Sequence, residues 1–211
     1  MGRIEILCSY LDCCESFADV GCDHGYCAEH VLKSGKCQSA VITDVSAKCL
    51  AKAEKLLKSY IDSGICRAVC CDGLARVPED TEQVLIAGMG GEEIIKFLSQ
   101  GFIPRKFVLQ PMKNAPKLRS FLLARGCKIT ADDIFRDDKF YFVIKGEREG
   151  GSAAYSKSQL FFGRDSINNP VLKDYAREEL TKRERHFTSC TDELARKKIA
   201  EEISLLTEVL K

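Results

Sequence analysis

Two hydrophobic patterns alternate over the first 126 residues of the chain. Short apolar runs that end in glycine or acidic turns are typical of buried strands, and apolar positions three or four residues apart indicate amphipathic helices. The runs predict strands at 17–21, 39–45, 67–73, 83–91 and 106–111, the last of which is expected to stop at Pro111. The spaced positions predict helices at 4–14, 26–35, 46–63, 115–125 and directly after Gly91. Strands that alternate with helices in this way predict a parallel α/β sheet with helices on both faces.

The pattern changes after residue 127. Residues 127–147 predict two strands around the turn Asp137-Asp138, which together form an antiparallel hairpin. Five parallel strands closed by such a hairpin resemble the Rossmann-like sheet of class I methyltransferases more than the sheet of dehydrogenases.

The end of the chain is expected to be helical. Residues 147–159 are polar and contain several glycines and serines, which predicts a linker. Two helices are expected beyond it, at 170–187 and from about residue 191. The second has apolar residues with the spacing of a coiled-coil seam, namely Ile199, Ile203, Leu206 and Leu210. We therefore expect a Rossmann-like domain over residues 1–150 and a C-terminal α-helical hairpin, coiled-coil-like, over residues 155–211.

Composition narrows the class of protein. Hydrophobic residues make up 45% of the chain and charged residues 30%, which is ordinary for a globular protein. The net charge is +1, so a surface for nucleic acid would have to be a local patch. No stretch approaches the roughly 20 apolar residues that span a bilayer. The N-terminus also lacks the basic start and apolar stretch of a signal peptide. We expect a cytoplasmic protein with no membrane contact, and a monomer is favoured.

The twelve cysteines do not indicate a metal site. Zinc sites favour pairs of cysteines separated by two residues, and this chain has no such pair. Several cysteines lie in apolar runs, as in residues 66–71, where a reduced cysteine acts as a small hydrophobic residue. Buried thiols and no bound metal are therefore expected.

The turn after the first strand holds the first candidate chemistry. Gly21 and Gly25 lack a Cβ atom, so the backbone there can approach a bound cofactor closely. A nicotinamide-binding turn has the pattern G-x-G-x-x-G, but Asp23 stands at its second glycine position. This suits a cofactor without a pyrophosphate. By itself the turn is equally compatible with an ordinary tight turn. The candidate cofactor residues of this turn are Asp19, Gly21, Asp23 and Gly25.

Acidic residues end the next two strands. Asp44 can accept hydrogen bonds from the ribose hydroxyls of a nucleoside cofactor, although it could also cap the following helix. Asp72 and Gly73 stand where a side chain can bind an adenine amino group, although a solvent-facing turn has the same sequence. Together, three such turns at the carboxyl ends of successive strands fit the ligand crevice of an open α/β sheet.

A glycine-rich loop follows the fourth strand. Its sequence is Ala87-Gly88-Met89-Gly90-Gly91, and its three glycines would leave space for a planar base. The alternative is a flexible loop without a ligand. We assign Ala87 and Gly88 to the cofactor, and Met89, Gly90 and Gly91 to the acceptor.

Several motifs resemble one bacterial family. ADVGCDHGY, CCDGL, IAGMGG, LQP followed by Asn114, LRSFLLARG and FFGR are similar to the tRNA methyltransferases that modify N1 of adenine at tRNA position 22. The resemblance runs from about residue 3 to the end of the chain. It implies S-adenosylmethionine (SAM) as cofactor and tRNA as substrate, and it adds Gln110, Pro111 and Asn114 to the acceptor site. The chain departs from the family at Met112, where asparagine is usual, and at Phe142, where glutamate is usual; both departures bear on acceptor recognition.

The implied reaction needs little proton transfer. Adenine N1 carries a lone pair that can attack the methyl group directly, so catalysis consists of alignment and of stabilising positive charge on the base. Asp23 is the first catalytic candidate and His24 the second; either side chain could instead hold the methionine end of SAM. The base has to be unpaired or flipped out of a stem.

A basic segment is the candidate tRNA surface. Residues 105–128 contain seven lysines and arginines and no acidic residue, in a chain of net charge +1. Lys113, Lys117 and Arg119 follow the fifth strand and are expected nearest the crevice, although a solvated helix face has the same composition. The tail has 11 basic and 10 acidic residues, so it should contribute shape more than charge.

Two other functions remain open at this point. One is a SAM-dependent methyltransferase for another RNA, a protein or a small molecule. The other is a non-catalytic RNA-binding protein of the same fold, which would be expected to have lost the SAM turns; here Gly21, Asp44, Asp72 and IAGMGG are all present.

Overall fold

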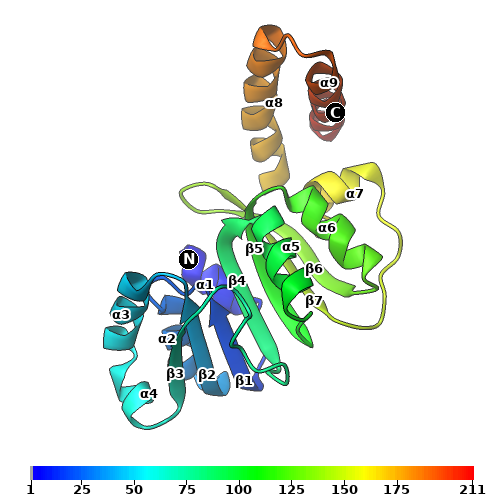
Figure 1. The fold of residues 1–211 in the computed structure, drawn as a ribbon. Coiled ribbons are helices and arrows are strands. Elements are labelled where there is room, and N and C mark those ends of the chain that lie inside the picture. The colour runs from blue at the N-terminus through cyan, green and yellow to red at the C-terminus, as the bar shows by residue number, and fades with distance from the viewer. Residues whose placement is uncertain (1) are drawn as a thin grey trace.

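The computed structural model describes residues 2–211 and contains one seven-stranded sheet. The strands are β1 (Cys14–Val20), β2 (Cys37–Asp44), β3 (Cys66–Cys70), β4 (Gln83–Gly90), β5 (Lys106–Lys113), β6 (Lys128–Arg136) and β7 (Phe140–Glu147). Their spatial order is β3-β2-β1-β4-β5-β7-β6. The first five strands are parallel, and β7 pairs antiparallel with both β5 and β6 (Figure 1). The predicted parallel sheet with a closing hairpin is confirmed.

Helices cover the sheet and form the end of the chain. They are α1 (Arg3–Ser9), α2 (Tyr26–Lys33), α3 (Ala47–Leu56), α4 (Lys58–Asp62), α5 (Gly91–Gln100), α6 (Ala115–Ala124), α7 (Lys157–Phe162), α8 (Val171–Ser189) and α9 (Glu193–Leu210). Adjacent residues of β1 point to opposite faces of the sheet. Phe17 packs in the core that contains residues of α1, α2 and α3, whereas Ala18 packs in the core that contains residues of α5 and α6.

Three local expectations were wrong. β5 does not stop at Pro111 but continues to Lys113, because the pairing with β4 shifts register there and needs no amide from the proline. The expected helix 46–63 is divided at Leu57, whose side chain is fully buried in the core. The last residues of the expected linker belong to α7, which Ser156 and Gln159 begin as a capping box.

A buried ion pair joins the sheet to the start of the tail. Arg119 of α6 donates from Nε to both carboxylate oxygens of Asp132 in β6, at 2.9 Å each, and both side chains are fully buried. The Nη1 atom of Arg119 donates to the carbonyl oxygens of Leu160 and Phe161 in α7. The expectation that Arg119 contacts RNA phosphates is therefore wrong, because its side chain is fully buried and exposes no donor to a phosphate.

The helices α8 and α9 pack against each other and extend from the closing hairpin (Figure 1). Ile199 and Leu206 of the predicted seam are buried, whereas Ile203 and Leu210 are partly exposed. Phe142 packs edge-on against Tyr175 of α8, with ring centroids 5.3 Å apart. The departure from the family pattern at residue 142 thus lies at the tail junction, away from the cofactor cavity. The division into domains 1–150 and 155–211 stays a prediction.

Candidate cofactor and acceptor site

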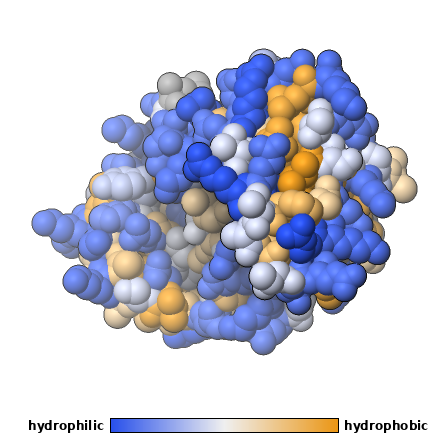
Figure 2. Space-filling model, turned by 90° about the horizontal axis from the view of Figure 1, so that it is seen from above, coloured by the Kyte–Doolittle hydropathy of each residue, from blue (hydrophilic) through white to orange (hydrophobic). Residues whose placement is uncertain are grey.

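A cavity of about 440 Å³ lies at the carboxyl ends of β1 to β4, with α1 forming one wall. Figure 2 shows this end of the molecule as a mostly hydrophilic face that is hollowed near its middle. The predicted residues that line the cavity are Asp19, Gly21, Asp23, His24, Asp44, Asp72, Gly73, Ala87, Gly88 and Met89. Parallel strands bring these separate turns together because their carboxyl ends meet at one edge of the sheet.

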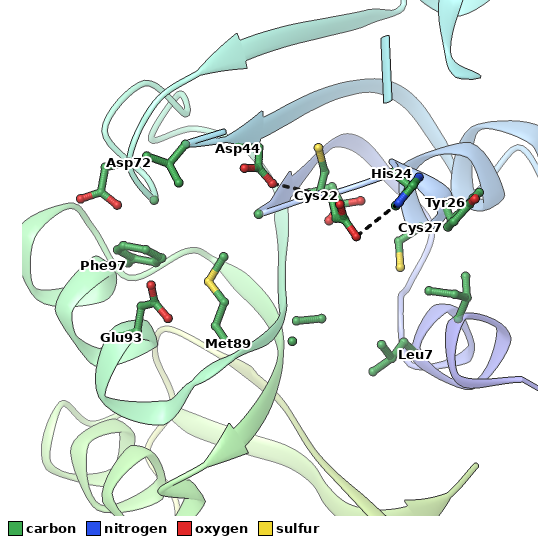
Figure 3. Close-up of a pocket in the computed structure, with 18 of the residues that line it drawn as sticks. Leu7, Cys22, His24, Tyr26, Cys27, Asp44, Asp72, Met89, Glu93 and Phe97 are labelled. Carbon is green, nitrogen blue, oxygen red and sulfur yellow. Dashed lines mark hydrogen bonds and ion pairs between the residues drawn. The ribbon is translucent and has the colours of Figure 1, made fainter. Parts of the chain in front are cut away.

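The two glycines of the first turn have different roles. Gly21 has φ +71°, and a Cβ atom there would lie 1.9 Å from Met89 Cε. The Gly21 turn therefore has to pass under the Met89 side chain, which points into the cavity (Figure 3). Gly25 does not line the cavity: a Cβ atom there would lie 2.9 Å from Ala53 Cβ in α3. Its missing side chain permits helix packing, and the assignment of Gly25 to the cofactor stays a prediction.

Asp44 is held in place by the backbone. Its Oδ1 accepts a hydrogen bond from Ser46 N at 2.7 Å, and its Oδ2 accepts one from Asp23 N at 3.1 Å. The cap of α3 is Ser46, which accepts from Cys49 N, so Asp44 is not the helix cap. Each carboxylate oxygen keeps a lone pair for a further donor. A fixed carboxylate with spare acceptors fits ribose hydroxyls.

Asp23 and His24 lie at the mouth of the cavity. Asp23 has φ +47°, which is uncommon for a residue with a side chain, and 62% of its side chain is exposed. Its Oδ2 lies 3.7 Å from Nε2 of His24 (Figure 3). The His24 ring stacks on Tyr26 with the centroids 5.4 Å apart and the planes 3° from parallel. The mouth thus combines a free carboxylate with an exposed aromatic pair.

Asp19 differs from the other carboxylates because it is buried. Its Oδ2 accepts a hydrogen bond from Ala28 N at 3.2 Å, and burial raises the pKa of its carboxyl group to about 7. A carboxyl group with this pKa changes charge near neutral pH. Positive charge brought into the cavity would stabilise its ionised form.

The β3 side of the cavity is open and polar. Asp72 forms an ion pair with Lys96, with 3.1 Å between Oδ2 and Nζ, and more than half of the Asp72 side chain is exposed. The Phe97 ring occupies the space that a Cβ atom on Gly73 would enter, at 2.4 Å. Glu93 and Phe97 of α5 lie beside Met89 and face Asp72 and Asp44 (Figure 3). This side offers an apolar ring and acidic acceptors.

The predicted acceptor residues form a strip beside the cavity. Met89 pairs with Pro111 and Gly90 pairs with Lys113 in the β4–β5 ladder, and a Cβ atom on Gly91 would lie 2.7 Å from Asn114 O. Of these residues only Met89 lines the cavity itself. Gln110 is fully buried, and its Oε1 accepts from Gly88 N at 3.2 Å. Gln110 therefore holds the glycine-rich loop after β4 through the amide of Gly88.

The basic segment is divided between the two ends of the sheet. Lys113 and Lys117 are exposed near the strip, and Lys117 forms an ion pair with Glu92. The first residues of β5 and β6 instead meet Glu147 at the opposite end of the sheet. The basic residues at that opposite end are Arg105, Lys106, Arg125 and Lys128. The expectation of one continuous basic track over 105–128 is wrong, because a strand runs between its two halves.

About half of the residues that line the cavity were not predicted from the sequence. The additional lining residues are Arg3, Ile4, Leu7, Cys22, Tyr26, Cys27, Val45, Cys71, Glu93 and Phe97. The α1 residues precede the first strand, where no turn motif marks them, and only the folded chain brings them to the cavity. Glu93 and Phe97 follow IAGMGG on the inner face of α5, so extension of that motif by helical spacing could have found them.

The cysteines are thiols, and half of them are buried. Six of the twelve cysteines are buried, and all are free. Cys22 lines the cavity, but burial raises the pKa of its thiol, so it stays neutral. Within residues 2–211 no cluster of three or more histidine, cysteine or acidic side chains could hold a metal ion. No helix in that range is both long and apolar enough to cross a membrane.

Comparisons with known proteins agree with this geometry. Residues 1–144 match the family model of a methyltransferase domain. A Mycoplasma pneumoniae protein named as a candidate tRNA methyltransferase is 32% identical over 158 residues, which cover 73% of this chain and 74% of the relative. The crystal structure of a candidate Streptococcus pneumoniae tRNA (adenine-22 N1) methyltransferase is 25% identical, with a TM-score of 0.89, and covers 100% of this chain and 99% of that one. A second structure of that protein, in complex with SAM, is 26% identical with a TM-score of 0.87 over 99% and 98% of the two chains.

Proposed function

This chain belongs to the methyltransferase-domain family, within the bacterial tRNA (adenine-22 N1) methyltransferases, and we propose that it transfers the methyl group of SAM to N1 of an adenine in tRNA. The observation that carries the proposal is the complete set of cofactor turns around one cavity, at Gly21, Asp44, Asp72 and Ala87-Gly88. A non-catalytic relative would have no reason to keep Asp44 fixed by the backbone with free acceptor lone pairs beside the other cofactor turns.

The cavity fits SAM in shape and in charge. Gly21 and Gly88 lack a Cβ atom, so the side chains of Met89 and Arg3 can lie close to the backbone at the cavity wall. Among the lining side chains, Asp19, Asp23, Asp44, Asp72 and Glu93 are acidic. SAM carries a sulfonium, an ammonium and ribose hydroxyls, and acidic groups suit all three. When bound, SAM supplies an electrophilic methyl group.

Asp23 supports the reaction through its charge. Its backbone amide is held by Asp44, while its carboxylate faces the mouth of the cavity. An adenine that accepts a methyl group at N1 becomes cationic, and a preorganised carboxylate stabilises that charge. The neighbouring stack of His24 and Tyr26 offers an aromatic face to an unpaired base. Asp23 thus acts on the developing charge, and the aromatic pair aligns the base.

The tRNA backbone is bound beside the strip. Lys113 and Lys117 are exposed next to the Gly90-Gly91 loop, and the ion pair to Glu92 is a surface pair that a phosphate can replace. The buried Arg119 takes no part. Two phosphate contacts give position without sequence information, so the choice of nucleotide depends on the tRNA shape and on the cavity mouth.

The test is nucleoside mass spectrometry of unmodified tRNA incubated with protein and SAM. The expected product is N1-methyladenosine, and a matched tRNA with guanine at position 22 should yield none. Methylation of both tRNAs would contradict position 22 as the site of modification. A different methylated nucleoside would contradict adenine N1 as the acceptor atom. SAM binding without any methylated tRNA would contradict the proposed function.

A further inference from the structure

Arg3 is the only arginine or lysine among the residues that line the cavity, whose acidic lining side chains number five. It begins α1, whose first turn is fixed by two contacts. Gly2 N donates to Glu5 Oε2 at 3.0 Å, and Arg3 N donates to Asp137 Oδ2 at 2.9 Å. The contact with Asp137 joins α1 to the turn of the β6–β7 hairpin. The backbone of Arg3 is therefore held by a segment that lies far away along the chain.

The guanidinium group is held from two sides. Nη2 donates to Gln110 Oε1 at 2.5 Å, and the guanidinium carbon lies 4.9 Å from the centroid of the Tyr141 ring. The same Gln110 oxygen accepts from Gly88 N. Arg3 Nε, by contrast, is buried and has no hydrogen-bond partner in residues 2–211. A buried donor without a partner is costly, so this atom is accounted for if a ligand in the cavity accepts its hydrogen bond.

The position of Arg3 indicates which part of the cofactor it meets. Asp72 and Phe97 lie on one side of the cavity, and Leu7 of α1 lies on the opposite side (Figure 3). If the adenosine of SAM occupies the side with Asp44 and Asp72, its methionine portion extends toward α1. The only anionic group of SAM is the methionine carboxylate. A guanidinium binds a carboxylate through paired N–H groups, with a charge-assisted hydrogen bond at each.

We propose that Arg3 binds the methionine carboxylate of SAM, and that Gln110 is the positioning residue that aims its guanidinium. This inference rests on the proposed use of SAM but not on the identity of the acceptor. It gives the cavity a discriminating element: the acidic residues attract any cationic adenosyl compound, and Arg3 selects the one that carries a carboxylate.

The experiment is calorimetric titration with SAM and with decarboxylated SAM, which keeps the adenosine, sulfonium and amine. The wild-type protein should bind SAM about 10- to 100-fold more tightly than the decarboxylated compound, as expected for loss of a charged hydrogen-bonded pair. Arg3→Met should weaken SAM by a similar factor and change the affinity for decarboxylated SAM less than about 3-fold. The affinity of Arg3→Lys for SAM should lie between those of the wild type and Arg3→Met, since lysine keeps the charge but lacks the planar guanidinium group.

Arg67→Met is the matched control, because Arg67 is exposed in β3 and does not line the cavity. It should change neither affinity. Equal weakening of both compounds in Arg3→Met, or equal affinity of the wild type for both, would overturn the proposal. The comparison of SAM with decarboxylated SAM on the wild-type protein needs no variant, so it tests the proposal even if Arg3→Met does not fold. Either negative result leaves tRNA methylation intact, whereas failure of the proposed function would appear as SAM binding without modified tRNA.

Discussion

The cofactor cavity and the tail junction both concentrate charge, but they use it in opposite ways. At the junction, Arg119 and Asp132 pair with each other and are fully buried. At the cavity, Asp23 and Asp44 hold no cationic partner except the weak contact of Asp23 with His24. The charges at the junction therefore serve the fold, whereas those at the cavity are available to a ligand.

The largest effect is expected from breaking the junction. Arg119→Met leaves the Asp132 carboxylate buried without its partner, which should lower the free energy of unfolding by about 3–5 kcal/mol. The double variant Arg119→Met with Asp132→Asn should recover much of the loss, because no unpaired charge remains. Lys117→Met on the exposed side of the same helix is the control, with a loss of about 0–1 kcal/mol. Urea unfolding measures all three, and equal losses in Arg119→Met and Lys117→Met would show that the junction charges do not serve the fold.

Removal of a cavity charge should affect turnover and leave the fold almost unchanged. Asp23→Asn keeps the shape of the side chain but loses the charge that would stabilise methylated adenine. We expect kcat to fall by about 100-fold and SAM affinity by less than about 3-fold. Single-turnover methylation and calorimetry measure the two quantities, with Asp62→Asn, an exposed carboxylate in α4, as the control. Equal losses in turnover and affinity would make Asp23 a cofactor ligand instead.

Asp19 combines features of both regions, because it is a buried carboxylate that lines the cavity. Its pKa is raised from 3.8 to about 7, so its neutral form is favoured in the folded protein. The contribution of Asp19 to stability should therefore be fully present below about pH 4, fall as the pH rises to about 7, and stay level above that. Binding of cationic SAM should favour the ionised form, which makes SAM affinity about tenfold higher at pH 8 than at pH 6.

Asp19→Asn separates this effect from other titrations. The variant should lose the part of the pH dependence between pH 6 and 8, and its melting temperature at pH 8 should exceed that of the parent in the absence of SAM. Calorimetry and thermal unfolding at pH 6 and pH 8 measure the two changes. A variant with the pH profile of the parent would show that Asp19 stays in one protonation state over this range.

The smallest effect concerns the exposed lysines beside the cavity. Changing Lys113 and Lys117 together to alanine should weaken tRNA binding several-fold and reduce the slope of log affinity against log salt by about 1–2, because two phosphate contacts are lost. SAM affinity should not change. The matched control is the pair Arg125→Ala and Lys128→Ala at the opposite end of the sheet. If the control pair has the larger effect on tRNA binding, the basic surface lies at the other end of the sheet.

The sheet and the chemistry of its turns could be predicted from the sequence alone. Hydrophobic runs and glycine turns are local signals, and parallel strands carry their ends to one edge, so Gly21, Asp44 and Asp72 could be assigned before any contact was known. The packing role of Gly25 could not be predicted, because a glycine needed for helix packing and one needed for a ligand look the same in sequence.

Whether a charged side chain is buried or exposed depends on the folded structure. Arg119 and Lys117 stand two residues apart on α6, yet one is fully buried and the other exposed, because residues two apart on a helix point in different directions and only one of these directions meets Asp132. Arg3 shows the reverse case. It precedes every strand and belongs to no turn motif, and it reaches the cavity because α1 packs beside the loops that follow β1 and β4. The sequence shows which residues are charged. Whether a charged side chain can contact a ligand depends on partners that lie far away along the chain.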